Sequence, residues 1–531
     1  MVFTLHRYIF GQLFRVFLLA TIALTLMMSM GAIVRPIQKY GIGPEQVVPL
    51  LAYFLPITLT FVLPMSALFA ASLVYGRFAS DNELDACRAS GVSFTTLVYP
   101  GLFLGVAVSV TTLVLSFYVV PAFVHRAEST IKANAEQILF RNIQRKGYYA
   151  IPGVPFRIFA DHANIETNTL QGVVIVESKE NTVSKLIPAE AARIEFETQK
   201  NFNEVSVIAR EAFQIDKHGQ AYSGLTTVKS TFASLLTDDI KFQRIDDIKR
   251  IQADKMNFYP IRQLAQTCRR QLAIEMLNER IAARLALPAP ENACKFVGHD
   301  RIVWFTAAGC SAADKATINL HGPIVLLELD KDLHTLICRW ESQTGVIKLE
   351  SDDFDATLDM ILDNPTHDRG DYKGIAQTHA IKYLPLPQDI QSALAEAHVL
   401  DAIDGLGTPG SLLAAPSHLL LQLRQQVTRK IARTILEINA EVHSRLVFGL
   451  GCTLLILTGI ALGVIFKGGH LLTAFGASSV PGAVLVIFIM TGKEFTKNPS
   501  ISMITGIIVM WTGLGVLILL ALSVYRKLLK T

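Results

Sequence analysis

The chain has 531 residues, of which 51% are hydrophobic and 18% are charged. A soluble globular chain carries about 25% charged residues, so this composition argues against a soluble protein and indicates membrane segments. The formal net charge of +4 is too small to indicate a nucleic-acid partner.

Apolar residues concentrate toward both ends of the chain, in six segments without Asp, Glu, Lys or Arg. A helix needs about 20 apolar residues to cross a hydrocarbon core of about 30 Å. The segments lack the alternation of barrel strands, so we expect six membrane-spanning helices, the first of them an uncleaved signal anchor. The segments are Val16–Val34, Val47–Tyr75, Gly91–Val124, Leu446–Phe466, Leu471–Gly492 and Asn498–Tyr525.

Basic residues in the short connecting segments predict the orientation, because cytoplasmic loops carry the excess of Lys and Arg. One side holds Arg7, Arg15, Arg77, Arg88, Lys467, Arg526, Lys527 and Lys530, and the other holds Arg35, Lys39, Lys493 and Lys497. We therefore expect both termini in the cytoplasm and the central region, about 125–445, beyond the inner membrane.

The segment between the second and third spans, residues 77–90, is called the elbow below. Ser80 followed by Glu83 fits a capping box, which predicts a short amphipathic helix with Ser80 as its N-cap. The elbow also carries Asp81, Asp85 and Arg88. Two interpretations remain open, namely a solvated connection that caps itself and a coupling helix that docks on a cytoplasmic motor subunit.

The region after the third span predicts a β domain. Its short β-like segments are separated by turn residues at intervals that suit an antiparallel sandwich or an open barrel. These segments are Phe156–Ala160, Gly172–Glu177, Arg193–Glu197 and Val205–Ala209. We expect the first three spans with the elbow in residues 1–124 and the β domain in residues 125–258.

The pattern changes after residue 258. Gln263–Leu287 predicts a helix, and a mixed region follows it, so that residues 259–420 have the character of an inserted module whose role the sequence does not reveal. Leu419–Val442 predicts a connecting helix, and residues 421–531 hold the last three spans.

Four cysteines, Cys268, Cys294, Cys310 and Cys338, fall in the inserted module. In an oxidising compartment an even number of cysteines allows one or two disulfides. Zinc is the weaker interpretation, because the module has no CxxC pair.

Motifs of catalysis are missing from the sequence, which contains no Walker A sequence, HExxH, GxSxG or glycine-rich dinucleotide loop. The 13 histidines are scattered, so we expect neither a metal nor a cofactor. A lipid-modifying membrane enzyme would need clustered catalytic groups near an interface, and none is found. A membrane sensor or scaffold with an external ligand-binding domain remains an alternative, and it would need no ATPase.

Residues Tyr75–Gly91, with Glu83-Leu84 and the Arg-Ala-Ser-Gly element at 88–91, resemble the YjgP/YjgQ permease family. This family comprises the LptF and LptG subunits of the lipopolysaccharide export ABC transporter. The resemblance covers about 1–255 and 425–531, and the long region 260–420 departs from the family pattern. Further similar segments are Leu5–Ile9, Tyr118–Pro121 and His443–Leu446.

The resemblance implies a six-helix membrane protein, in two blocks of three spans, with a large extracytoplasmic β-jellyroll-like domain that here carries an unusual α/β insertion. The partners implied are an LptB-like ATPase dimer, a second permease of the same family, LptC/LptA-like jellyroll bridge proteins and lipopolysaccharide. ATP would be bound by the ATPase, and this chain would be non-catalytic. An exporter of another amphipathic lipid remains an alternative.

The resemblance also assigns roles to single residues. Glu83 matches the acidic residue that contacts the ATPase, and Asp81, Asp85 and Arg88 surround it. Basic residues near the outer end of the first span contact lipid phosphates in the family, which suits charge-assisted hydrogen bonds. The candidates here are Arg35, Lys39, Arg126 and Lys132. Snorkelling at the membrane interface is the alternative interpretation of these residues.

Overall fold

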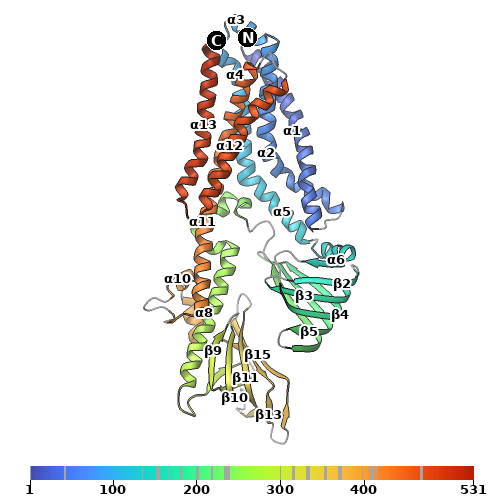
Figure 1. Ribbon diagram of the computed structural model, residues 1–531, viewed down its shortest axis with the longest axis vertical. Coiled ribbons are helices and arrows are strands. Elements are labelled where there is room, and N and C mark those ends of the chain that lie inside the picture. The colour runs from blue at the N-terminus through green and yellow to red at the C-terminus, as the bar shows by residue number, and fades with distance from the viewer. Residues whose placement is uncertain are drawn as a thin grey trace. The chain divides into compact units, whose positions relative to one another are not determined.

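The computed structural model describes most of the chain (Figure 1). The described ranges are 2–40, 44–133, 135–150, 156–164, 167–179, 182–198, 203–216, 219–232, 239–298, 301–313, 317–330, 335–351, 356–368, 373–396, 399–406, 412–413, 415–466 and 471–530. The chain divides into two compact units. Unit 1 comprises Met1–Asp254 and Arg433–Thr531, and unit 2 comprises Lys255–Ala432.

Long apolar helices dominate unit 1. Within the described residues, six helices are long and apolar enough to cross a membrane, which agrees with the six segments expected from the sequence. The six spans are formed by α1 (Val2–Tyr40), α2 (Pro44–Ser80), α4 (Phe94–Val114) with its continuation α5 (Val120–Ala133), α11 (His418–Ile465), α12 (Leu471–Lys497) and α13 (Met503–Lys530). The shorter helices α3 (Glu83–Ala89) and α6 (Ala135–Lys146) also belong to unit 1, whereas α11 begins in unit 2. A π-helical turn, η1 (Leu115–Val119), joins α4 to α5. The connecting helix and fourth span expected separately form the single helix α11.

Small residues allow α11 to pack closely against α2 and α4. A Cβ atom at Gly463 would lie 2.6 Å from the carbonyl oxygen of Ser72, which no side chain could accept without a shift of the backbone. The hydroxyl of Ser109 in α4 donates to the carbonyl oxygen of Gly449 at 2.6 Å. In lipid, helix association depends on such close packing and on hydrogen bonds between helices. Gly449 and Gly463 therefore permit close helix packing within this chain.

One antiparallel sheet forms the β part of unit 1, with its described strands paired in chain order. The strands are β1 (Tyr148–Ala150), β2 (Phe156–Asn164), β3 (Thr169–Lys179), β4 (Thr182–Thr198), β5 (Asn203–Asp216) and β6 (Gly219–Phe232). Alternate residues such as Ile158, Ile175 and Ile194 are buried on one face, against Leu139 and Phe140 of α6. All four expected β segments lie in strands of this sheet, and the jellyroll arrangement stays a prediction.

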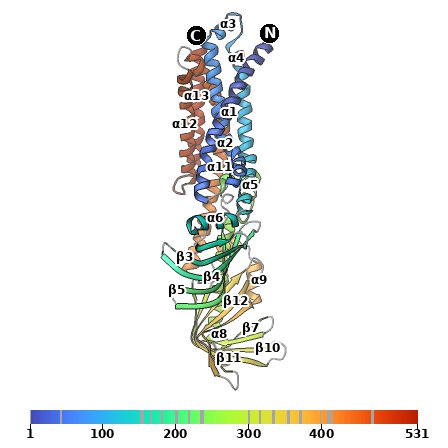
Figure 2. The same ribbon diagram turned by 90° about the vertical axis from the view of Figure 1, so that its right-hand side faces the viewer.

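The remainder of unit 1 follows the sheet. A 3₁₀ turn, η2 (Ile240–Phe242), leads into the helix α7 (Ile245–Ala253). Figure 2 shows the sheet beyond α6, at the opposite end of the helices of unit 1 from α3 and from the two chain ends.

Unit 2 consists of a long helix on a second antiparallel sheet. It begins with η3 (Lys255–Asn257) and α8 (Tyr259–Leu285), which corresponds to the expected helix Gln263–Leu287. Nine strands are described, from β7 (Cys294–Val297) and β8 (Arg301–Thr306) to β15 (Thr378–Pro385), with α9 (Gln388–Glu396) and α10 (Val399–Asp404) after them. The others are β9 (Gly309–Ala313), β10 (Thr317–Asp330), β11 (Leu336–Ser351), β12 (Ala356–Asp363), β13 (Thr366–Asp368) and β14 (Lys373–Ile375).

The core of unit 2 joins one face of α8 to the sheet. Leu272 and Leu277 of α8 lie in one buried cluster with Phe305 and Leu326 of the strands. All four cysteines of the module, and the two in the helices of unit 1, are free thiols. Neither of the two disulfides that the sequence allows is formed.

Candidate functional site: the elbow and a buried ion network

The elbow is a tight connection between α2 and α4 with α3 at its centre. The N-cap of α3 is Asn82, with φ 57° in the left-handed region, and no side chain caps this end of the helix. The predicted capping box is therefore wrong. Ser80 belongs to the last turn of α2, where its hydroxyl donates to the carbonyl oxygen of Arg77 at 3.0 Å. A residue held in one helix cannot adopt the extended backbone that an N-cap needs.

The acidic side chains of the elbow differ in their surroundings. Asp81 is exposed and pairs with Arg77 at 3.4 Å between carboxylate and guanidinium, a surface pair that contributes little to stability. Glu83 is partly buried, whereas Asp85 and Arg88 are exposed. The elbow thus carries three acidic and two basic side chains, of which Asp81 and Arg77 pair with each other.

Apolar packing fixes α3 to the helices around it. Leu84 is 4% exposed and shares a buried cluster with Phe94 of α4 and Tyr75 of α2. The hydroxyl of Tyr75 donates to the carbonyl oxygen of Leu97 at 2.8 Å, which joins α2 to α4 just behind the elbow. A force on α3 would therefore act directly on two membrane-spanning helices.

Both ends of the chain lie beside the elbow, as Figures 1 and 2 show. Near the N-terminus, His6 forms a hydrogen bond of 3.0 Å with the carbonyl oxygen of Thr96. Near the C-terminus, the ring of Tyr525 contacts that of Phe94, with centroids 6.2 Å apart. The elbow and both termini consequently share one end of the helix bundle.

The candidate lipid-binding residues lie on two helices. Arg35 and Lys39 belong to the last part of α1, and Lys132 belongs to α5, but the side chains of all three lie outside the described residues. Arg126 of α5 is exposed, with its guanidinium carbon 5.6 Å from the centroid of the Phe123 ring. A joint role for these four residues in lipid binding stays a prediction.

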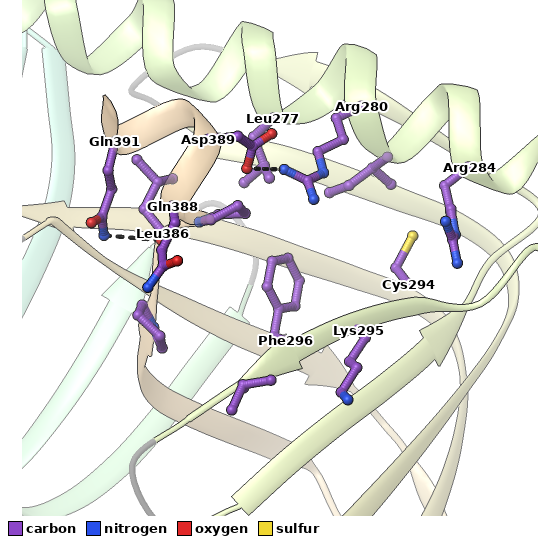
Figure 3. A pocket seen from close by; sticks show the side chains of 14 residues that line it. Leu277, Arg280, Arg284, Cys294, Lys295, Phe296, Leu386, Gln388, Asp389 and Gln391 are labelled. Atoms are coloured by element: carbon purple, nitrogen blue, oxygen red, sulfur yellow. Dashed lines mark hydrogen bonds and ion pairs between the residues drawn. The ribbon is translucent and has the colours of Figure 1, made fainter. Parts of the chain in front are cut away.

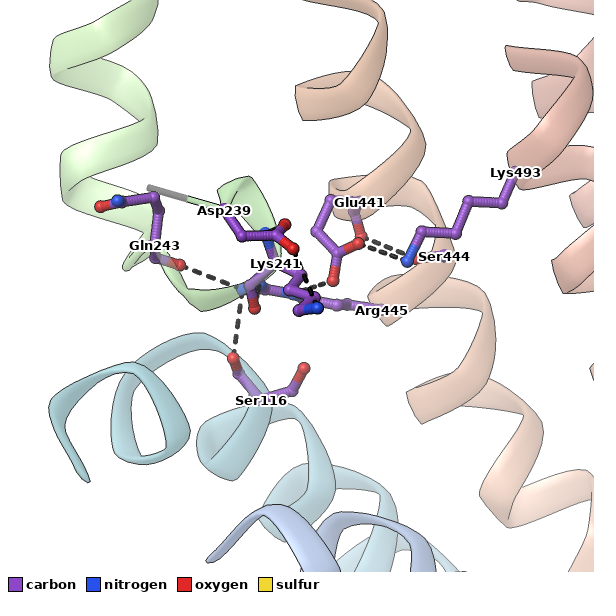
Figure 4. Close-up of polar contacts among 8 residues, drawn as sticks. All are labelled: Ser116, Asp239, Lys241, Gln243, Glu441, Ser444, Arg445 and Lys493. Carbon is purple, nitrogen blue, oxygen red and sulfur yellow. Dashed lines mark hydrogen bonds and ion pairs between the residues drawn. The ribbon is translucent and has the colours of Figure 1, made fainter. Parts of the chain in front are cut away.

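A buried arginine forms the second candidate site, where α11 meets the end of the third span and the turn η2 (Figure 4). Arg445 of α11 is 7% exposed. Its Nε donates to the carboxylate of Glu441 at 3.1 Å, and its Nη atoms donate to the carbonyl oxygens of Ser116 at 3.1 Å, Gln243 at 3.3 Å and Lys241 at 2.7 Å. One guanidinium thus joins α11 to η1 of the third span and to the turn η2 that follows the sheet.

The π-helical turn explains why the Ser116 carbonyl is available. In η1 the N–H of Val120 bonds to the carbonyl oxygen of Leu115, five residues earlier. The next donor in this pattern would be residue 121, which is proline and has no N–H. The carbonyl oxygen of Ser116 therefore lacks a backbone donor from position 121, and Arg445 supplies a replacement.

Glu441 completes the network by binding a second cation. Its other carboxylate oxygen pairs with the ammonium of Lys493 in α12. The carboxylate is mostly buried and lies between two positive side chains, so both of its oxygens have charged partners. Buried ions of this kind are tolerated only when they are paired, and the network fixes α11, α12 and η2 relative to one another.

Little in the sequence points to this network. Glu441 and Arg445 have the spacing of an ion pair on one helical face, which could have drawn attention to them. The partners of Arg445 in η1 and η2 are 329 and 204 residues away in the sequence, so no local pattern connects them.

A sequence model for the family described as lipopolysaccharide export system permease LptF/LptG matches residues 7–302. This match covers more than half of the 531 residues. The chain belongs to the LptF/LptG family. No curated protein matches the chain.

Family membership gives the chain a general role in lipopolysaccharide export, as a membrane permease within a multi-component system. Permeases of the LptF/LptG family are generally non-catalytic. The match includes the elbow, the sheet of unit 1, α8 and β7. It therefore extends beyond residue 255, where the first part of the resemblance ended, but it does not include the second part, residues 425–531.

Proposed function

We propose that this LptF/LptG permease is one of two transmembrane subunits of an ABC transporter that extracts lipopolysaccharide from the inner membrane and passes it to a periplasmic bridge. The family match is the observation that carries this proposal. The partners proposed are an LptB-like ATPase dimer, a second permease of the family and LptC/LptA-like bridge proteins.

In this proposal α3 is the coupling helix. Glu83, with Asp81, Asp85 and Arg88 around it, contacts the ATPase at the cytoplasmic end of the bundle. The anchoring of α3 through Leu84 supports this role, because it couples movement of α3 to α2 and α4. ATP is bound and hydrolysed by the partner, and this chain converts that movement into a change of the lipid pathway.

The orientation proposed places the two termini and the elbow in the cytoplasm and the sheet β1–β6 in the periplasm, where it forms a jellyroll-like platform for lipid transfer. Three spans then precede and three follow the extracytoplasmic part. We place four basic residues near the periplasmic surface of the inner membrane, where they contact lipid phosphates. They are Arg35, Lys39, Arg126 and Lys132. The excess of Lys and Arg on the proposed cytoplasmic side supports this orientation.

Affinity purification in mild detergent tests the proposal. Wild-type protein is compared with Glu83→Arg, and the copurifying proteins are identified by mass spectrometry. Glu195→Arg is the matched control, because Glu195 is an exposed acidic residue of β4, away from the elbow. We expect an ABC-type ATPase and a second six-helix permease with the wild type and the control, and loss of the ATPase from Glu83→Arg.

Two outcomes would count against the proposal in different ways. If the ATPase accompanies all three proteins equally, Glu83 is not a coupling residue. If no ATPase accompanies abundant and intact wild-type protein, the sensor or scaffold interpretation is favoured instead. Release of lipopolysaccharide from proteoliposomes, compared with release of another anionic lipid, then identifies the substrate.

A further inference from the structure

We propose that unit 2 contains a binding site for an anionic amphiphile with one alkyl chain and a phosphate or carboxylate head. The site is a cavity between α8, β7 and the segment from β15 into α9 (Figure 3). Its volume is about 740 Å³, within the range of about 300–1,000 Å³ typical of small-molecule sites. The inference concerns unit 2 alone and does not depend on the proposed transport function.

Apolar side chains form the floor of the cavity. Leu277 and Ile281 of α8, Phe296 of β7 and Leu386 line it, and each belongs to the buried core of unit 2. The ring of Phe296 stacks on that of Phe305, with centroids 5.7 Å apart. These four side chains are only 1–5% exposed, so an alkyl chain would bury apolar area mainly on the exposed lining residues Val297, which is 44% exposed, and Pro385.

The thiol of Cys294 also faces this space. Burial raises the pKa of Cys294 to about 11, although the guanidinium of Arg284 acts in the opposite direction. The thiol is therefore neutral at pH 7, and it extends the apolar wall without repelling an anion.

Two arginines of α8 also line the cavity, beside its apolar side chains. Arg280 forms an ion pair with Asp389 of α9. Arg284 donates from Nε to the carbonyl oxygen of Ala293 at 3.4 Å and has no acidic partner among the residues that the structure describes. Lys295 also lines the cavity and adds a positive charge, with its ammonium 5.4 Å from the centroid of the Trp304 ring.

This combination defines the ligand chemistry. A guanidinium presents paired donors that match a phosphate or a carboxylate, so Arg284 selects an anionic head. A free inorganic anion would leave the apolar floor uncovered, and an uncharged chain would leave Arg284 without a charged partner. An amphiphile with one negative head and one alkyl chain satisfies both parts of the cavity.

Photo-crosslinking of the full chain in nanodiscs of uncharged phospholipid tests this inference. The probe is dodecyl phosphate with a diazirine in its alkyl chain, and crosslinked peptides are mapped by mass spectrometry. We expect labelling of the peptides that contain Leu277, Phe296 or Leu386, and competition by unlabelled dodecyl phosphate. Arg284→Gln should weaken binding by about tenfold or more, because a charge-assisted hydrogen bond is lost.

Two further variants distinguish loss of binding from misfolding. Arg270→Gln is the matched control, because Arg270 is exposed on α8 and does not line the cavity. It should leave the affinity unchanged. Asp389→Asn removes the carboxylate that lines the cavity and should tighten binding, an effect that an unfolded variant cannot produce.

Three results would overturn the inference. The first is labelling confined to the membrane-spanning helices. The second is equal labelling by the uncharged probe dodecanol with the same diazirine, since the head would then have no role. The third is competition by inorganic phosphate at the concentration at which dodecyl phosphate competes, since the apolar floor would then have no role and the site would bind free phosphate.

Discussion

The guanidinium of Arg445 donates to the carbonyl oxygen of Ser116 at 3.1 Å, five residues before Pro121. The proline removes the backbone donor that the π-helical turn would otherwise direct at this carbonyl. A side chain from α11 thus completes the hydrogen bonding of another membrane helix. The same guanidinium binds two carbonyl oxygens around η2. Arg445 therefore attaches η2, the turn that follows the sheet, to the π-helical turn η1.

The first prediction concerns the pairing of Arg445 with Pro121. Arg445→Leu alone should lower the free energy of unfolding by about 3–5 kcal/mol, because it leaves Glu441 and three carbonyls with fewer partners. Pro121→Ala restores an N–H near the Ser116 carbonyl, so Arg445→Leu should cost about 1 kcal/mol less in that background. A double-mutant cycle of unfolding in detergent measures this coupling, and strictly additive effects would contradict the explanation.

The second prediction concerns Glu441 and its two cations. Glu441→Leu leaves Arg445 and Lys493 as neighbouring positive charges and should lower the free energy of unfolding by about 3–5 kcal/mol. Lys493→Met leaves the Glu441–Arg445 pair intact and should have a clearly smaller effect, because this lysine is partly exposed. The melting temperatures of the two variants in detergent test this order. A larger decrease in melting temperature for Lys493→Met than for Glu441→Leu would show that the network is assigned incorrectly.

Much of the membrane part could be predicted because charge is excluded from lipid. Each charge-free run overlaps a long helix that the structure contains, although the bounds differ. Arg7 and Arg15 made the first run begin later than α1 does, and the sixth run begins at Asn498, before α13. The short β-like segments between turn residues likewise located β2 to β5. The capping box failed because this local pattern does not reveal that α2 continues through Ser80.

The unpredicted features are those built from distant segments. The ion network combines residues from η1, η2, α11 and α12, and the cavity of unit 2 combines α8, β7 and α9. A single sequence carries no record of which polar residues meet in space. The pairing of Arg280 with Asp389, 109 residues apart, is an example that only the three-dimensional fold reveals.

The third prediction separates docking from coupling at the elbow. Leu84→Ala removes the apolar anchor of α3 at a local cost of about 2–5 kcal/mol and leaves the acidic side chains in place. If the proposed function holds, the ATPase should still copurify, while ATP-driven release of lipopolysaccharide from proteoliposomes falls severalfold. Glu83→Arg should instead lose the ATPase. Release at the wild-type rate by Leu84→Ala would argue against α3 as the element that transmits movement.

The fourth prediction follows from the free thiols. All six cysteines should react with maleimide in denaturant without prior reduction, and a reducing agent should leave the melting temperature unchanged. In the folded protein, Cys268 and Cys294 should react slowly at pH 8, because burial raises the pKa of each to about 11 and the thiolate is the reactive form. Fewer than six reactive thiols in denaturant would instead reveal a disulfide.

The last prediction concerns Glu328, a carboxylate in unit 2 that is 3% exposed. Burial alone would raise its pKa, but hydrogen bonds from His379 at 2.6 Å and Arg301 at 2.9 Å outweigh this and lower the pKa. A lowered pKa in the folded state means that the charged carboxylate stabilises the fold above the ordinary glutamate range. This stabilisation is lost as the pH falls through the folded-state pKa.

Glu328→Gln should therefore lower the free energy of unfolding by about 1.5–3 kcal/mol near neutral pH, and the difference from wild type should shrink as the pH falls below about 4. The indole of Trp340 donates to Glu328 at 2.8 Å, so its fluorescence reports locally. The chain has three tryptophans, so replacing Trp304 and Trp511 with phenylalanine leaves Trp340 as the only tryptophan in the variant. A difference in stability that stays constant as the pH falls from 7 to well below the ordinary glutamate range would show that the charge of Glu328 does not stabilise unit 2, because only the ionised form benefits from Arg301 and His379.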